Sequence, residues 1–408
     1  MYHFLRLLAL IAIFFCGGFG CARKISPISL VICESGTLAK IFSGDNNSAS
    51  SFSDREQVAR TLEATASSLA KRDSSALLTL GPLTVTRSDL ISSNLIIADS
   101  VRQWGEGEAL AKFLERNFIA ICSEDSGKGL ITGYYEPVIY GSLVPTPAHR
   151  FPLYGLPDDL VHSEDSKRFT LGRARRISDG SLVPYFSRKQ IDYEQALSGR
   201  GLEIAWLKDP VDRAFLHIQG SGQIVLPDNR IVKVGFADKN GHPYRPIGRY
   251  LIEQGFLTSS EVSMQRIRAF LRENPQYLQQ TLTYDESYVF FRIISSAEGE
   301  GPIGSLGVPL TPQRSVAVDP KIYPLGTPLF VETVAVDSEG SSEEKFKLEP
   351  LMGIMSAQDT GGAIVGVERV DIFFGTGEKS GFRAGMQKYP GRVVAVIKSD
   401  CYGCKNRN

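Results

Sequence analysis

From Gly129 to the end of the chain, short segments rich in β-branched and aromatic residues alternate with turns that contain proline and glycine. The segments include "GLITGYYEPVIYG", "EIAWLKD", "AFLHIQGSGQIVL", "SVAVDP", "PLFVET" and "RVVAVIK". Many short strands separated by such turns are typical of an all-β barrel or sandwich. The sequence therefore predicts a mainly β fold over most of its length.

Helical patterns precede and interrupt this β region. "DREQVARTLEATASSLAKRD" and "RSDLISSNLIIADSVRQWGEGEALAKFLERNF" have helical apolar spacing, and Asp54 can cap the first. Ser187 and Gln190 are placed as a capping box, and residues 246–280 predict three short helices separated by Gly255 and Pro275. Because β segments lie on both sides of these helices, we expect one barrel interrupted by a second unit.

The amino terminus has the pattern of a secretory signal. The apolar run that follows Arg6 is short of the roughly 20 residues a spanning helix needs, and it fits the central region of a signal peptide. We therefore expect export, with a signal peptide or lipoprotein signal over residues 1–21. Residues 22–53, which contain the polar "SGDNNSASSFS", predict a flexible tether.

Gly20-Cys21 resembles the end of a lipoprotein signal, so Cys21 is the candidate lipidation site. Gly18 stands where that pattern usually has leucine. Cys16, a plain cleaved signal and an uncleaved anchor are the alternatives. In each case any contact with a membrane would be made through the amino terminus alone.

Charge and cysteine content exclude several classes of partner. Forty-five basic residues balance forty-five acidic ones, so no net field favours nucleic acid or an anionic membrane surface. Six scattered cysteines do not make a disulfide scaffold. Cys401 and Cys404 have redox or half-zinc-site spacing without a second pair, which predicts a local disulfide or idle thiols in the tail.

Familiar catalytic motifs are missing from the sequence. It has no Walker A loop, His-Glu-x-x-His or Gly-x-Ser-x-Gly, and its five histidines are too scattered for a metal cluster. His217, in "AFLHIQGSG", is interpreted as a strand residue satisfied by the backbone rather than as a base. Carboxylates therefore remain the best candidates for chemistry.

Two aspartates stand in the glycine-rich segment "AQDTGGAIVGVERVDIFFGTGEKSG". "RVDIFFG" predicts a strand, so Asp371 and Phe373 point to one face while Ile372 and Phe374 point to the other. Apolar neighbours raise the pKa of a carboxyl and make it available as a general acid. Asp359 precedes Thr-Gly-Gly, where backbone can approach a substrate closely. The alternative is that Asp359 caps a turn and Asp371 is merely hydrogen-bonded in its strand.

Other residues suit a sugar polymer. Tyr134 and Tyr135 offer flat faces with polar tips, but they point to opposite sides of a strand, so we expect one in a groove and one in the core. Glu136 is an alternative acid, although it precedes proline and can simply end a strand. Gln219 and Ser221 could hydrogen-bond sugar hydroxyls; a bulged hairpin is the alternative explanation for their glycine-rich segment.

At these residues the chain resembles the membrane-bound lytic murein transglycosylase A family. The resemblance runs from about residue 75 to Lys398 and includes "TGYYEP", "QGSGQIVLPDNRIVKVGFADKNGHPYRPIGRYLIEQG", "MQRIRAFLRENP", "FFR", "VPLTPQRSVAVDPKIYPLGTPLF" and "LMGIMSAQDTGGAIVGVERVDIFFGTGEKSGFRAG". The stretch "DTGGAIVGVERVD" is one residue longer than the family form, which predicts a bulge in that loop. The tail, residues 401–408, lies beyond the resemblance.

The resemblance implies a double-psi β-barrel interrupted by an inserted β-rich domain, with a glycan groove between them. Its first part would lie in residues 54–140 together with the amino-terminal helices, and its second part in 287–400. The insert would take residues 141–286.

For function, the resemblance implies a peptidoglycan lytic exotransglycosylase, although the sequence itself leaves exo and endo cleavage open. Members cleave the MurNAc–GlcNAc β-1,4 bond without water and leave a 1,6-anhydro-MurNAc end. Their essential acid falls on Asp371 and their second aspartate on Asp359, and no metal or cofactor is required. The expected partners are peptidoglycan strands and other cell-wall enzymes, on the periplasmic side of the envelope or at the outer membrane.

Two rival functions follow from the same residues. An aspartic peptidase would need two Asp-Ser/Thr-Gly motifs, and Asp359-Thr-Gly and Asp125-Ser-Gly supply them, but the flanks of Asp125 are those of an exposed turn. A non-catalytic glycan-binding module is the second rival, since one fold can serve binding and catalysis. The presence of both aspartates favours the enzyme.

Overall fold

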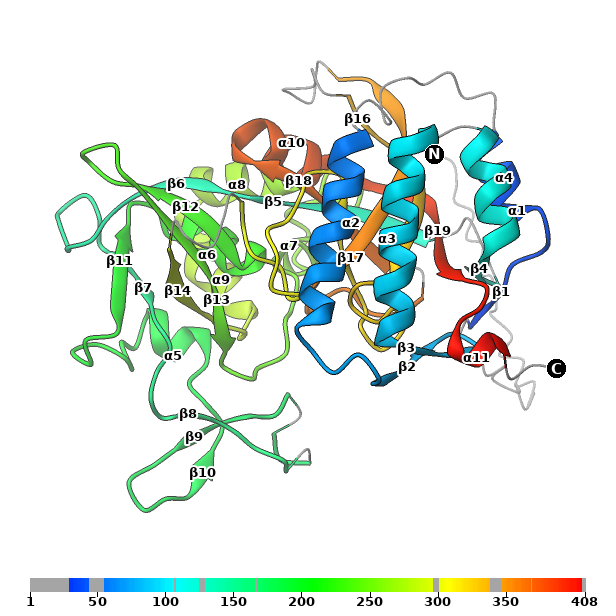
Figure 1. Cartoon of the computed structure of the whole chain (residues 1–408). Coiled ribbons are helices and arrows are strands. Elements are labelled where there is room, and N and C mark those ends of the chain that lie inside the picture. The colour runs from blue at the N-terminus through cyan, green and yellow to red at the C-terminus, as the bar shows by residue number, and fades with distance from the viewer. Residues whose placement is uncertain are drawn as a thin grey trace, which may run out of the picture.

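The computed structural model describes residues 29–43, 55–105, 108–124, 129–165, 167–169, 171–295, 301–337, 346–367 and 369–405. The expected signal over 1–21, its cysteines Cys16 and Cys21, and the Asp54 cap lie outside these ranges. Figure 1 shows two lobes, a barrel flanked by helices and a second lobe built from the green middle of the chain. Within the described ranges, no helix combines the length and the apolar character needed to cross a bilayer.

The first lobe is a closed six-stranded barrel. Its strands are β5 (Gly129–Glu136), β15 (Ser315–Val318), β16 (Pro328–Val336), β17 (Leu348–Thr360), β18 (Arg369–Thr376) and β19 (Lys388–Lys398). The ring closes because β5 pairs both with β18 and with β19. The pairs β15–β17 and β5–β18 are parallel, and the other pairs are antiparallel. This closed barrel agrees with the double-psi fold expected from the sequence.

Alternate side chains of the barrel strands point inward and fill the barrel with an apolar core. Every second residue of a strand points to the same face, and the inward set includes the almost fully buried Ile131, Val316, Leu329, Met355, Ile372 and Ile397. Outward residues of the same strands either pack in a second core, as Phe330 and Val394 do, or line a site.

Helices cover one side of the barrel (Figure 1). They are α2 (Arg55–Ala70), α3 (Arg87–Trp104) and α4 (Glu108–Asn117), and α10 (Gly377–Met386) follows β18 directly. Thr86 and Asp89 form a capping box that begins α3. The hairpin β2 (Leu77–Leu80) and β3 (Leu83–Thr86) joins α2 to α3. A disulfide joins Cys401, which precedes the short α11 (Tyr402–Lys405), to Cys404 within that helix. The expected helices and the expected local disulfide are thus confirmed.

The prediction of a flexible tether over residues 22–53 is wrong for residues 29–43, the part that the structure describes. Residues Leu30–Ile32 form β1, which pairs with β4 (Phe118–Ser123) beside the barrel, and Thr37–Ser43 form α1. A disulfide between Cys33 and Cys122, not foreseen from the sequence, ties this segment to β4. Three apolar residues are too few to show a strand pattern, and the partner strand lies far along the chain.

The second lobe contains a six-stranded sheet in the order β14-β13-β12-β6-β11-β7. Its strands are β6 (Val138–Ser142), β7 (Phe151–Tyr154), β11 (Glu203–Leu207), β12 (Ser221–Val225), β13 (Ile231–Lys239) and β14 (Val289–Ile294). A small sheet of β8 (Leu160–His162), β9 (Arg173–Arg176) and β10 (Leu182–Val183) projects from it (Figure 1). The chain enters this lobe between β5 and β6 and leaves it after β14, so the lobe interrupts the barrel.

The helices of the second lobe are α5 (Arg188–Asp192), α6 (Pro210–Gln219), α7 (Ile247–Glu253), α8 (Met264–Glu273), η1 (Pro275–Tyr277) and α9 (Leu278–Tyr284). Ser187 and Gln190 form the expected capping box of α5. The three helical segments expected over 246–280 are present.

The segment "AFLHIQGSGQIVL" is a helix followed by a strand, not the single β segment that its composition predicts. Asp209 caps α6 by accepting from the Val211 amide at 2.7 Å, and Pro210 occupies the first turn. Gly220 ends the helix in the left-handed region at φ 77°, and β12 begins at Ser221. The signals that start the helix, Asp209 and Pro210, precede the segment, and the signal that ends it, Gly220, lies in its middle, so the composition of the segment alone does not reveal the helix.

Candidate active site

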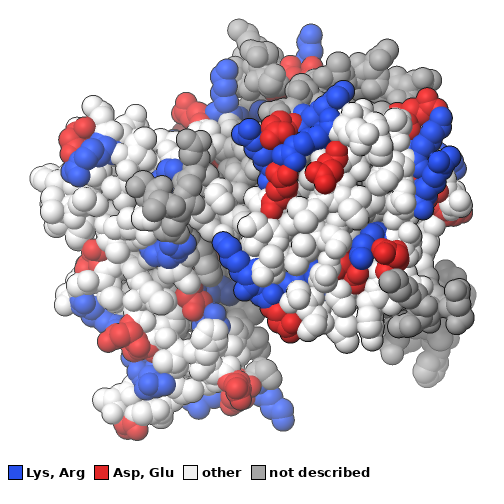
Figure 2. Space-filling model, in the orientation of Figure 1, with Lys and Arg blue, Asp and Glu red and all other residues white. Residues whose placement is uncertain are grey.

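A cavity of about 860 Å³ lies between the two lobes. The barrel contributes residues of β5, β17, β18 and the segment 303–310, and the second lobe contributes the end of α6 and parts of β13 and β14. The total charge is balanced, and acidic and basic side chains are interspersed on the face of the molecule in Figure 2. The cavity is therefore distinguished by its shape and its particular side chains rather than by a strong field.

Strand register places both aspartates of the glycine-rich segment in this cavity. Ala317 on β15 is opposite Asp359 on β17 and also opposite Asp371 on β18. Thr132 on β5 is opposite Asp371 from the other side. Asp359, Ala317, Asp371 and Thr132 therefore form one row across four adjacent strands, and the small side chain of Ala317 leaves space between the carboxyls.

Asp371 has the environment of a general acid. Burial raises the pKa of its carboxyl to about 6, although the Thr132 hydroxyl, which donates to Oδ1 at 2.7 Å, and the Arg369 guanidinium both lower it. The charge of Asp359 adds to the increase. Because the acid is protonated in about half of the molecules near pH 6, it can both give and take a proton.

Asp359 is held by hydrogen bonds on both of its oxygens. Oδ1 accepts from the Ser305 amide at 2.9 Å, the Ser305 hydroxyl at 2.8 Å and the Thr360 amide at 2.9 Å. Oδ2 accepts from the Tyr134 hydroxyl at 3.0 Å. Burial raises the pKa of Asp359 despite these donors. With its oxygens engaged by the protein, Asp359 is suited to holding the site rather than to transferring a proton.

The two tyrosines divide as their alternation predicts. Tyr134 lines the cavity and packs against Phe373 with ring centroids 5.4 Å apart. Tyr135 is buried in the barrel core, where it contacts Arg268, and it does not line the cavity. Its candidate role in substrate binding is therefore wrong, because strand alternation turns its ring to the opposite side from Tyr134.

Gln219 and Ser221 both line the cavity, at the end of α6 and the start of β12. The Gln219 side-chain oxygen accepts from the Tyr135 amide at 3.0 Å, so one of its polar atoms already has a partner. Ser221 begins the strand that follows Gly220. A helix end followed by a strand, not a bulged hairpin, places these two side chains in the cavity.

Two other candidates play a structural part: Glu136 does not line the cavity, and His217 lines it but is engaged by the backbone. Glu136 is fully buried and accepts from Gln223 of the second lobe and Thr376 of the barrel, at 2.8 and 2.7 Å, so it connects the lobes. His217 accepts from the Val289 amide at 3.1 Å, as a backbone-satisfied histidine should, but it lies in a helix. Burial lowers its pKa strongly, which keeps the ring neutral.

Thr132, Ser305 and Tyr244 line the cavity and were not foreseen as site residues. The period of two along β5 could have indicated Thr132, since it shares a face with Tyr134. Nothing in the local sequence connects Ser305 or Tyr244 to the aspartates. Asp125 of the peptidase reading lies outside the described ranges. Over those ranges, no three His, Cys, Asp or Glu side chains are grouped as a metal site requires.

Comparisons with known proteins agree with this architecture. Residues 130–292 match the MltA specific insert domain and residues 314–397 match the 3D domain. The membrane-bound lytic murein transglycosylase A of Vibrio cholerae is 30% identical over 295 residues, covering 72% of each chain. The Escherichia coli K12 protein of the same name is 33% identical over 273 residues, covering 66% of each.

Solved structures of lytic murein transglycosylases resemble this chain over most of its length. The membrane-bound lytic murein transglycosylase of Agrobacterium tumefaciens superposes with a TM-score of 0.72 at 29% identity, covering 91% of this chain and 98% of that one. Escherichia coli MltA with bound chitohexaose superposes with a TM-score of 0.67 at 26% identity, covering 91% and 94%. With this fold, this insert and this relationship, the chain belongs to the membrane-bound lytic murein transglycosylase A family.

Proposed function

We propose that this protein is a lytic transglycosylase that cleaves the MurNAc–GlcNAc β-1,4 bond of peptidoglycan without water and leaves 1,6-anhydro-MurNAc ends. The observation that carries the proposal is a carboxyl group, Asp371, whose pKa is raised to about 6 by burial in a cavity between two lobes. Relatives named as lytic murein transglycosylases, and one related structure that holds a sugar hexamer, support the substrate class.

The reaction needs one acid, used twice. Protonated Asp371 gives its proton to the glycosidic oxygen, and the bond from C1 of MurNAc to that oxygen breaks. The oxygen of the MurNAc C6 hydroxyl then bonds to C1, and the Asp371 carboxylate takes the proton that this hydroxyl loses. The atoms of the substrate are all kept in the two products, so neither water nor an enzyme nucleophile takes part.

Asp359 has a supporting part in this proposal. Hydrolases that retain or invert configuration use two carboxyl groups at a set separation, one of which attacks the sugar or activates water. Here the second carboxyl accepts four hydrogen bonds from the protein. We assign it to tuning Asp371, whose pKa its charge raises, and to holding Tyr134 and Ser305 in place.

Digestion of purified sacculi tests the proposal directly. Mass spectrometry of the soluble products distinguishes anhydro ends from reducing ends, which are heavier by one water. The wild type should release anhydro-muropeptides, and Asp371→Asn should release none while keeping the wild-type circular dichroism spectrum. Asp158→Asn is the matched control, because the Asp158 side chain is 93% exposed on the second lobe. Full activity of the Asp371 variant would end the assignment.

The same experiment separates the rival functions. A glycan-binding module would bind sacculi and release nothing, and a hydrolase would release reducing ends. The peptidase reading predicts cleavage of protein that an aspartic-peptidase inhibitor blocks. None of these outcomes is compatible with anhydro ends that depend on Asp371.

The cellular setting is also part of the proposal. We place the protein on the periplasmic side of the envelope, lipid-anchored to the outer membrane at Cys21, in contact with peptidoglycan and other cell-wall enzymes. The support is the Gly20-Cys21 pattern after the apolar run. Cys21→Ser should abolish labelling by a fatty-acid analogue and release the protein from membranes, whereas Cys16→Ser should change neither. The reverse result would assign the anchor to Cys16.

A further inference from the structure

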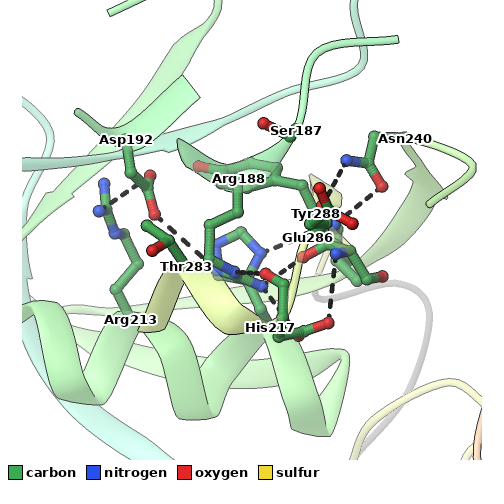
Figure 3. Close-up of polar contacts among 12 residues, drawn as sticks. Ser187, Arg188, Asp192, Arg213, His217, Asn240, Thr283, Glu286 and Tyr288 are labelled. Carbon is green, nitrogen blue, oxygen red and sulfur yellow. Dashed lines mark hydrogen bonds and ion pairs between the residues drawn. The ribbon is translucent and has the colours of Figure 1, made fainter. Parts of the chain in front are cut away.

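The turn that follows β13, residues 240–245, is held by a buried side chain at its start. Asn240 is 1% exposed, and its amide nitrogen donates to the carbonyls of Phe186 and Glu286, both at 2.9 Å. Its amide oxygen accepts from the backbone amide of Tyr288 at 2.9 Å (Figure 3) and from that of His242 at 3.3 Å. One side chain thus joins the turn to two neighbouring segments.

The other end of the turn is held by a buried carboxylate. Asp285 accepts from the Arg245 amide at 3.0 Å and from the Ser287 amide at 3.2 Å. Arg188 donates to the Asp285 and Ser287 carbonyls at 3.0 and 2.5 Å. Both Arg188 and Asp285 are almost completely buried. Buried, well-partnered polar networks of this kind rigidify the segments they connect.

Arg188 forms an ion pair with Asp285 at 3.5 Å and a second one with Asp192 (Figure 3). Asp192, on α5, lies 3.8 Å from Arg188 and 2.8 Å from Arg213 of α6. These three side chains are 3–4% exposed. The turn is therefore anchored, through Arg188, to two helices of the second lobe.

The residue that this turn presents to the cavity is Tyr244. It lines the same cavity as Asp371, from the opposite lobe, and is partly exposed there. Its hydroxyl makes no hydrogen bond to any residue in the described ranges. Burial, then the charges of Asp285 and Asp371, raise its pKa well above the ordinary value for tyrosine. The hydroxyl therefore keeps its proton and lies within electrostatic reach of the acid.

We propose that Tyr244 is a second catalytic residue, which donates a hydrogen bond to a hydroxyl or acetamido oxygen of the sugar whose bond Asp371 breaks. The inference rests on the proposed function and extends it to the second lobe. No proton leaves Tyr244. Its hydroxyl and the rigid turn hold the sugar so that its C6 hydroxyl faces C1, which is the contribution of orientation to rate.

The test is the kinetics of anhydro-product release by Tyr244→Phe, which removes only the hydroxyl. A neutral hydrogen bond is worth about 0.5–1.5 kcal/mol, or roughly a twofold to tenfold change in rate, and donors that act in the transition state exceed this. We expect kcat to fall about tenfold or more with KM changed less than twofold. Tyr140→Phe is the matched control, since Tyr140 is 69% exposed and does not line the cavity.

The pH profile separates contact with substrate from an effect through Asp371. If Tyr244 contacts the sugar, the pH at which activity falls stays at the wild-type value in Tyr244→Phe. A kcat within twofold of wild type, or a displaced pH profile, would overturn the inference while leaving the proposed function intact. Absence of anhydro product from the wild-type protein would instead overturn the proposed function.

Discussion

The hydrogen bond from Thr132 to Asp371 gives the sharpest test of the site. Replacing Thr132 by valine keeps the shape and the β-branching of the side chain and removes the hydroxyl that donates to the acid at 2.7 Å. That bond favours the charged carboxylate, so its loss should raise the pKa of Asp371 further. Because the acid must be protonated to cleave the glycosidic bond, the variant should remain active at higher pH than the wild type.

The strength of the hydrogen bond from Thr132 sets how far the pKa of Asp371, and with it the pH profile, should move. A hydrogen bond to a charged group contributes about 1.5–3 kcal/mol, and one pKa unit corresponds to about 1.4 kcal/mol. Asp371 is partly accessible, so water replaces part of what the hydroxyl supplied, and we take the lower end of that range. The fall in kcat/KM that is centred near pH 6 in the wild type should move upward by about one unit.

The assay is kcat/KM for anhydro-product release from soluble glycan strands between about pH 4 and pH 9, because this ratio reports the pKa of the free enzyme. Thr376→Val is the matched control. Thr376 donates to the carboxyl of Glu136 at 2.7 Å, so the control loses the same kind of bond away from the cavity. An unchanged profile for the Thr132 variant, or a displacement to lower pH, would refute the assignment of Asp371 as the acid held by this bond.

Two further predictions use the same row of residues and the unforeseen disulfide. Asp359→Asn should move the pH profile the opposite way, to below about 6, because the Asp359 charge raises the pKa of Asp371; an upward movement in the same assay would contradict this. Cys122→Ser should lower the free energy of unfolding in urea by roughly 2–5 kcal/mol, since the bond to Cys33 closes a separation of 89 residues. Reductant should destabilise the wild type by more than this variant, which keeps only the Cys401–Cys404 disulfide among those described. Equal stability of the two proteins without reductant would contradict the prediction.

Local patterns predicted much of the fold. The period of two along "RVDIFFG" placed Ile372 in the core and Asp371 on the other face, and the same rule separated Tyr134 from Tyr135. Helices were predicted from their apolar spacing and caps. Two predictions failed. The β1 strand within the tether was missed because its partner strand is distant in the chain, and the helix that contains His217 was missed because its start signals, Asp209 and Pro210, precede the segment.

Strand alternation, a local property of the backbone, let the sequence determine which face of β18 carries Asp371 and that apolar neighbours surround it. Only the tertiary structure decided which residues stand beside the acid. Thr132 lies 239 residues away in the chain and reaches Asp371 because β5 pairs in parallel with β18. Asp359 and Asp371 are aligned by their shared neighbour Ala317, so the length of the loop "GAIVGVER" between them does not set their register. Closure of the barrel fixes these non-local pairings, and no single segment contains the information that aligns them.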